Sequence, residues 1–242
     1  MSEIEWFTQF PVGETLKMAK IENFYDVVKS RKSIRAYLEK DVDRKLVEEI
    51  LELSSRAPSG ANIQAWQVIV LHNGALIKLG RKLFDMSVAG IKEEPEYQFY
   101  PRSWREPYLA RRRKVGWDLY RALGIARGER SKIERQQARN FMFFGAPVGL
   151  IFTMDRDMEL GSWLDLGGFI QTIALVARSF GLDSCIQAAF SEYHKTISEE
   201  LDISPERQII CGLALGYRDE SAPENNFPTE RAPLKDFVRF IE

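Results

Sequence analysis

The stretch RAPSGANIQAW, residues 56–66, separates a predicted amphipathic helix from a predicted apolar strand. Before it, apolar residues recur at helical spacing from Val42 to Leu53, which predicts a helix opened by Asp41 or Asp43. After it, WQVIVLH, residues 66–72, is short, apolar and rich in β-branched side chains, as a buried strand is. The stretch itself is therefore a helix-to-strand loop. Its small residues allow close approach of backbone to a ligand, and its amide side chains suit a flat hydrogen-bonding edge.

The composition predicts one globular domain. The chain has 242 residues, of which 45% are hydrophobic and 29% charged, and no flexible linker, repeat or low-complexity tract interrupts it. Only two cysteines, Cys185 and Cys211, and two histidines are present, so neither a disulfide framework nor a zinc site is expected, and buried free thiols are. Residues 1–10 lack the basic and apolar pattern of a secretory signal, so we expect a reducing cytoplasm.

The charge is unevenly distributed. Residues 102–139 carry twelve Lys or Arg against four Asp or Glu, a balance of +8 that leaves −9 for the rest of a chain whose net charge is −1. Such a segment is a solvated helical face, or a surface that attracts an anionic small molecule or nucleic acid. Because the chain as a whole is not basic, we expect no nucleic acid partner. A preference for a carboxylated aromatic substrate is the corresponding hypothesis.

The rest of the chain alternates helices with strands, which predicts an α/β or α+β fold with four or five strands. Residues 23–32 predict a first helix capped by Asn23. Residues 161–184 form a helix that is apolar on nearly every side. Polar residues interrupt it, so burial within protein is expected rather than a membrane span. Residues 218–242 predict an extended arm whose apolar residues, Phe237 among them, need a surface to pack on.

An insertion at about residues 85–140 is predicted to be helical and broken by prolines. Aromatic residues lie between these breaks. They either pack the insertion onto the body or contribute to a substrate pocket. The residues concerned are Tyr97, Phe99, Tyr100, Trp104 and Tyr108.

Dinucleotide, P-loop, hydrolase and zincin motifs are all missing from the sequence. Three clusters remain: SRKSIR at 30–35, PSGANIQAW at 58–66 and ERAPL at 230–234. In the first cluster, guanidinium groups and a hydroxyl could hold a phosphate and a polyol chain. By charge alone, the cluster could equally be a solvated basic helix end.

Four motifs in order carry a specific resemblance. SRKSIRAY at 30–37, APSGANIQAW at 57–66, GLDSCIQAAF at 181–190 and the tail GYRDESAPENNFPTERAPLKDF at 216–237 resemble the nitroreductase family of FMN-dependent oxidoreductases. The likeness covers about residues 23–242. The basic middle of the chain resembles the nitrobenzoate-reductase type within that family.

The resemblance implies an α+β sandwich with a mixed central sheet of four or five strands, in an intertwined homodimer with two FMN molecules at its interface. The segment of Arg31, Lys32, Ser33 and Arg35 would contact the phosphate, ribityl chain and pyrimidine side of the flavin. Pro58, Ser59, Gly60 and Asn62 would come from the partner subunit. The backbone at Ile186 and Gln187 would lie beside the isoalloxazine, and Arg231 on the phosphate. Asp165 would approach the ribityl chain, or else serve at an interface or as a cap.

The function implied is reduction of nitroaromatic compounds, nitrobenzoates or quinones by NADH or NADPH, with ping-pong kinetics. The acceptor would be a small aromatic molecule. The flavin would carry the electrons, so no catalytic side chain and no metal are expected. Reductive dehalogenation, flavin fragmentation and a flavin-binding module without turnover are the alternatives on the same scaffold.

Overall fold

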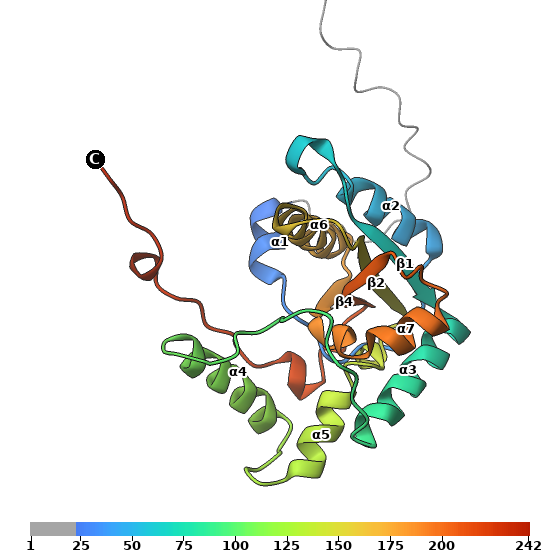
Figure 1. The fold of residues 1–242 in the computed structure, drawn as a ribbon. Coiled ribbons are helices and arrows are strands. Elements are labelled where there is room, and N and C mark those ends of the chain that lie inside the picture. The colour runs from blue at the N-terminus through green and yellow to red at the C-terminus, as the bar shows by residue number, and fades with distance from the viewer. Residues whose placement is uncertain (1–22) are drawn as a thin grey trace, which may run out of the picture.

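Four strands form the sheet at the centre of the molecule: β1 (Gln67–His72), β2 (Val148–Asp155), β3 (Asp183–Gln187) and β4 (Arg207–Gly216). Their order in space is β1-β2-β4-β3 (Figure 1). The helices are α1 (Phe24–Ser30), α2 (Arg44–Ser54), α3 (Asn73–Val88), α4 (Tyr108–Ala122), α5 (Arg130–Ala138), α6 (Leu160–Ser179) and α7 (His194–Glu200). This computed structural model describes residues 23–242. The first ten residues, on which the expected absence of a secretory signal rests, lie outside that range.

The direction of the strands corrects one expectation. The sheet is not mixed, because β1 with β2, β2 with β4 and β3 with β4 are all antiparallel pairs. Within residues 23–242, parallel pairing is confined to an isolated bridge between Ser33 and Ser184. A strand that is apolar throughout has the same sequence pattern in either direction, so the pattern could not decide the point.

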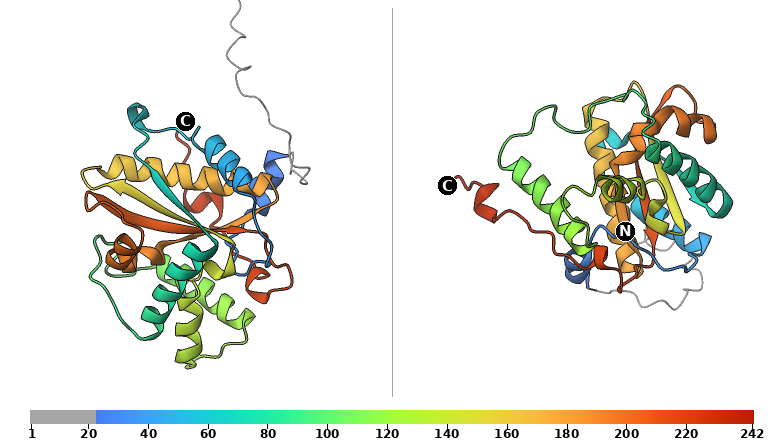
Figure 2. Two further views of the ribbon diagram at one scale, coloured as in Figure 1. Left: turned by 90° about the vertical axis from the view of Figure 1, so that its right-hand side faces the viewer. Right: turned by 90° about the horizontal axis from the view of Figure 1, so that it is seen from below.

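Helices cover both faces of the sheet (Figure 2). Side chains of alternate residues on β2 point to opposite faces. Leu150 and Phe152 pack with α2 and α6, whereas Ile151 packs with α3 on the other side. The architecture is thus an α+β sandwich, as predicted, with four strands.

Helix α6 lies across one face of the sheet and packs against α1, α2 and β3. Among the described helices it is the one long and apolar enough to cross a membrane by length and composition, and 39% of its apolar window is buried inside the protein. Its inward side chains, such as Leu166 and Ile173, belong to the core. Leu160 and Leu164 are instead 81% and 78% exposed.

The first helix ends earlier than the sequence pattern predicted. Asn23 caps α1 by accepting a hydrogen bond from the Tyr25 N–H at 3.0 Å, but the helix stops at Ser30. Arg31 is already extended, with φ −61° and ψ 121°. The first basic cluster therefore lies on an extended segment beside β3 rather than on a helix end.

The insertion and the tail lie outside the packed layers. Helices α4 and α5 project below the sheet, and the chain after Phe227 runs away from the body past α4 (Figure 1). Phe237 is 69% exposed and Ile241 84% exposed. Residues 23–242 thus leave these two apolar side chains of the arm largely uncovered.

Candidate functional site

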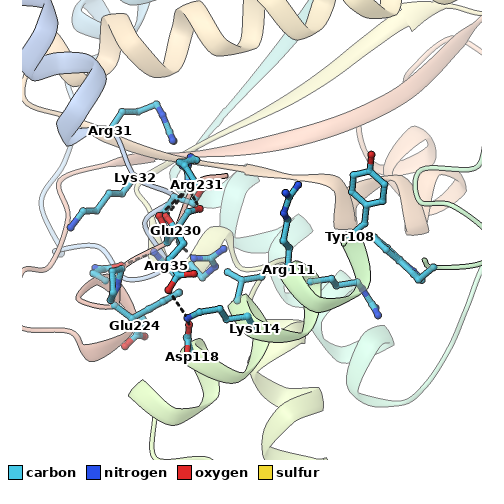
Figure 3. Close-up of a pocket in the computed structure, with 18 residues that line it drawn as sticks. Arg31, Lys32, Arg35, Tyr108, Arg111, Lys114, Asp118, Glu224, Glu230 and Arg231 are labelled. Carbon is cyan, nitrogen blue, oxygen red and sulfur yellow. Dashed lines mark hydrogen bonds and ion pairs between the residues drawn. The ribbon is translucent and has the colours of Figure 1, made fainter. Parts of the chain in front are cut away.

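A pocket of about 480 Å³ lies between the extended segment after α1, helix α4 and the start of the tail (Figure 3). It brings together five of the eleven residues predicted for the site. These are Arg31, Lys32, Ser33, Arg35 and Arg231. Segments about 200 residues apart in sequence therefore meet here.

Two arginines in this pocket repel each other. The pKa of Arg31 is lowered, first because its guanidinium is half-buried and second because Arg231 lies nearby. Within the described chain neither guanidinium forms an ion pair with a carboxylate, and Arg231 donates only to backbone and hydroxyl oxygens of Thr229 and Glu230. Uncompensated like charges at a partly buried position are costly, and a dianionic phosphate between them would remove that cost. The donor set fits the phosphate of FMN.

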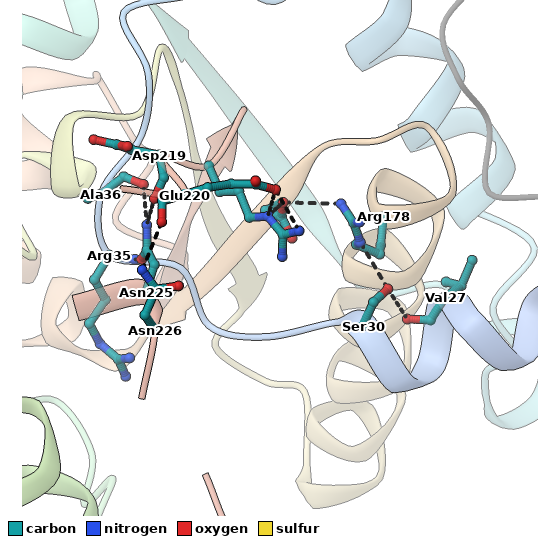
Figure 4. Close-up of polar contacts among 11 residues, drawn as sticks. Val27, Ser30, Arg35, Ala36, Arg178, Asp219, Glu220, Asn225 and Asn226 are labelled. Carbon is teal, nitrogen blue, oxygen red and sulfur yellow. Dashed lines mark hydrogen bonds and ion pairs between the residues drawn. The ribbon is translucent and has the colours of Figure 1, made fainter. Parts of the chain in front are cut away.

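Backbone hydrogen bonds fix the extended segment that carries this cluster. The Ile34 N–H donates to the Ser184 carbonyl at 3.1 Å, which attaches the segment to β3. The Arg35 N–H donates to Asn225 Oδ1 at 2.8 Å, and Asn225 Nδ2 donates to the Ala36 carbonyl at 2.8 Å (Figure 4). The buried side-chain amide of Asn225 thereby satisfies one backbone N–H and one backbone carbonyl of the segment.

Arg178 holds the start of the same segment. Arg178, in the last turn of α6, donates to Ser30 Oγ at 3.0 Å and to Asp183 Oδ2 at 3.2 Å (Figure 4). Burial raises the pKa of Asp183, and the guanidinium groups of Arg178 and Arg218 counteract that rise. The carboxylate is 2% exposed, so the pair ties α1, α6 and β3 together beneath the pocket.

Arg139 connects the insertion to the pocket. Arg139 donates to Glu224 Oε1 at 2.6 Å and to the Arg35 carbonyl at 3.2 Å. Sequence reasoning did not single out Arg139, Glu224 or Asn225. Their partners are 85 to 190 residues away in sequence, and no local pattern indicates such pairings.

The aromatic residues of the insertion were expected either to pack it onto the body or to line a pocket, and the structure shows both. Tyr97 packs its ring on Trp163 of α6, with centroids 4.7 Å apart, and its hydroxyl donates to the Ile210 carbonyl. Trp104 and Tyr108 line the pocket. Tyr97 thus anchors the insertion on the body, and Trp104 and Tyr108 contribute to the pocket wall.

The end of β3 contributes no side chain to the lining of this pocket. Ile186 is 43% exposed, while Gln187 is buried and donates to the Asn140 carbonyl at 2.7 Å. The predicted role of these two residues concerned their backbone. Strand β3 does border the extended segment, through the bridge between Ser33 and Ser184.

The loop after α2 lies elsewhere. Figure 1 shows it at the top of the molecule, on the side of the sheet away from α4, and none of Pro58, Ser59, Gly60 and Asn62 lines the pocket. Ala61, Asn62 and Gln64 have φ values of 48°, 58° and 53°. Such values are uncommon for residues other than glycine and concentrate at functional sites.

Hydrogen bonds hold this loop in its strained form. Ser59 Oγ accepts from the Gln64 N–H at 3.0 Å, and Asp165 Oδ2 accepts from the Gly60 N–H at 3.0 Å. Trp66 stacks on Phe169 of α6 with centroids 4.6 Å apart. Three roles were considered for Asp165, and within residues 23–242 it accepts from a backbone N–H at the start of the short helix Gly60–Asn62, as a cap does.

The two cysteines are free and buried, as expected. Burial raises the pKa of Cys185, and it raises that of Cys211 to about 12. Neither thiol is therefore a reactive thiolate at neutral pH.

Comparisons with known proteins agree with this geometry. The model of the nitroreductase family matches residues 28–217, and the chain belongs to that family. The chain is 40% identical over 230 residues to a 4-nitrobenzoate reductase of Nocardioides sp. (strain LMS-CY), covering 93% of each protein. It is 35% identical to the nitrobenzene nitroreductase of Ectopseudomonas oleovorans over 89% of this chain and 96% of that protein. The crystal structure of the FMN and NADPH-dependent nitroreductase NfnB from "sphigopyxis sp. strain HMH" superposes with a TM-score of 0.87 at 33% identity, covering 91% of this chain and 99% of that one.

Proposed function

We propose that this protein is an FMN-dependent oxidoreductase that uses NADH or NADPH to reduce nitroaromatic compounds. The observation that carries the proposal is the pair of mutually repelling arginines, Arg31 and Arg231, in a pocket that a phosphate would complete. The names of three relatives, a 4-nitrobenzoate reductase, a nitrobenzene nitroreductase and an FMN and NADPH-dependent nitroreductase, support it. They favour nitro reduction over dehalogenation or flavin fragmentation.

Each part of the site would have one task. Arg31 and Arg231 would hold the phosphate. Lys32, Ser33 and Arg35 would contact the ribityl chain and the pyrimidine edge, where a cation stabilises negative charge as it develops. When bound, FMN supplies the redox chemistry, accepting a hydride from the nicotinamide and passing electrons to the acceptor. The protein itself would orient both substrates in turn over one face, and we expect ping-pong kinetics for that reason.

We further propose a homodimer in which the loop of residues 58–62 completes the site of the partner subunit. The exposed apolar surface supports this. Leu160 and Leu164 are exposed at the end of α6 where Asp165 contacts the loop. At the other end of α6, α1 packs beside Arg178 and leaves Phe24 69% exposed. Large exposed apolar side chains on one side of the molecule favour association. The strained backbone of the loop, free of any role in its own chain's pocket, is consistent with a role across the interface.

The same proposal covers the organisation of the chain. Residues 1–242 would form one domain, with the insertion at about 85–140 acting as a lid and the arm at 218–242 packing its exposed Phe237 and Ile241 on the partner subunit. The free thiols fit a cytoplasmic location. The absence of nucleic acid, membrane and metal partners stays a prediction.

A direct assay tests the function. Purified protein supplied with FMN should retain a yellow colour after gel filtration and oxidise NADPH only when nitrobenzene or 4-nitrobenzoate is added. Protein that stays colourless and does not oxidise either nicotinamide with any nitroarene would refute the proposal.

A further inference from the structure

Helix α4 forms a second cationic wall of the pocket, opposite the arginines proposed for the FMN phosphate. Figure 3 shows Arg111 extending from α4 toward the sheet, into the pocket that separates α4 from Arg31 and Arg231. Arg112 lines the same wall. One phosphate group accounts for Arg31 and Arg231, so the charge on α4 calls for a different anion.

The cations on this wall are not equivalent. Lys114 is neutralised, because its ammonium lies 2.6 Å from Asp118 and 3.2 Å from Glu230. Arg112 stacks on Trp104, with its guanidinium carbon 4.9 Å from the ring centroid. The guanidinium of Arg111 forms no ion pair or hydrogen bond with any residue in 23–242, and its carbon lies 6.0 Å from the centroid of the Tyr108 ring. Of the three α4 cations that line the pocket, Arg111 is thus the one that neither pairs with a carboxylate nor stacks closely on a ring, and its guanidinium is available to a ligand.

We propose that Arg111 recognises the carboxylate of a carboxylated nitroaromatic acceptor, an inference that rests on the proposed function. A guanidinium presents parallel donors that match a carboxylate, and one carboxylate neutralises one arginine. Tyr108 and Trp104 supply flat apolar surface beside it for the ring. The relative at 40% identity is named for a substrate of this chemistry. The 2′-phosphate of NADPH is the competing anion, and the experiment separates the two.

The test compares kcat/KM for 4-nitrobenzoate with kcat/KM for nitrobenzene, which is a similar ring without the charge. In Arg111→Gln the ratio of the two should fall about tenfold, as loss of one charge-assisted hydrogen bond at an accessible site predicts. In the matched control Arg113→Gln the ratio should stay within about twofold, because Arg113 is exposed on the same helix and does not line the pocket. In the wild type, the ratio should also fall as salt is added.

A binding measurement gives a readout that does not depend on turnover. Titration of the FMN-loaded protein with benzoate, followed by the change in the flavin absorption spectrum, should show about tenfold weaker binding to Arg111→Gln than to Arg113→Gln. Unchanged benzoate binding and an unchanged ratio would overturn the proposal. A raised KM for NADPH with an unchanged ratio would also overturn it, and would assign Arg111 to the phosphate of the donor. If the wild type reduced neither nitroarene, the proposed function itself would fail instead.

Discussion

The pocket beside α4 and the face formed by α6, α1 and the loop of residues 58–64 are both incomplete within one chain, but they lack different things. The pocket holds arginines without counter-charges. The face holds exposed leucines and a strained backbone that residues 23–242 leave uncovered. The first deficit is satisfied by a small anion and the second by a protein surface. A flavin bound between two copies of the chain would satisfy both at once.

The largest effect is expected from removing the charge of the pocket. The double variant Arg31→Ala with Arg231→Ala should weaken FMN binding by about two orders of magnitude or more, since each charge-assisted hydrogen bond contributes about 1.5–3 kcal/mol. Fluorescence titration with FMN and with riboflavin, which lacks the phosphate, measures this. The wild type should prefer FMN and the variant should not. Equal FMN affinity in both proteins would show that the arginines are surface charges.

The next largest effect is expected on the apolar face. Leu164→Arg places a charge where a partner is proposed, and burial of an unpaired charge costs several kcal/mol. Sedimentation should show dissociation to single chains, with FMN affinity falling in parallel. Ile77→Arg is the control, because Ile77 is also exposed, at 48%, but lies on α3 on the opposite face of the sheet. Dissociation by the control as well would mean that the choice of face is wrong.

A smaller effect tests the link between the loop and α6. Asp165→Ala removes the acceptor for the Gly60 N–H and should cost about 1 kcal/mol of local stability. Hydrogen exchange at Gly60 should accelerate several-fold, and FMN affinity should fall by a similar factor. Asp157→Ala removes an exposed carboxylate close in sequence and should change neither. Faster exchange with unchanged FMN affinity would show that the loop of residues 58–64 takes no part in FMN binding.

The smallest effect on the site is expected from Glu200, a carboxylate that already forms ion pairs with two lysines. Glu200 lies 2.8 Å from both Lys78 and Lys82, and these lysines lower its pKa from 4.5 to about 2. Its stabilising effect is therefore present above about pH 4.5 and is lost as the pH falls toward 2. Glu200→Gln should be less stable than the wild type at neutral pH, equal to it near pH 2, and normal in FMN affinity. Urea unfolding between pH 2 and 7 measures the free energy of unfolding of both proteins. A difference that grows as the pH falls would contradict the prediction.

The sequence predicted local structure, and the pocket unites the first and last of its three clusters, but the contacts that join these segments could not be predicted. Asn23 and Asp43 cap helices as their side chains suggested, because capping depends on neighbours in sequence. The antiparallel direction of all the strand pairs and the pairing of Arg35 with Asn225 depend on how distant segments meet. The positive φ of Ala61 was equally hidden, since alanine does not signal a left-handed conformation.

If two copies of the chain enclose the flavin, as we propose, sedimentation velocity followed at the visible absorption band of FMN will detect it. We expect the flavin signal to travel with a species of about twice the 27.9 kDa chain mass, and to leave that species when Leu164→Arg dissociates it. Flavin that sediments tightly bound to a single chain would show that the site does not lie between two copies.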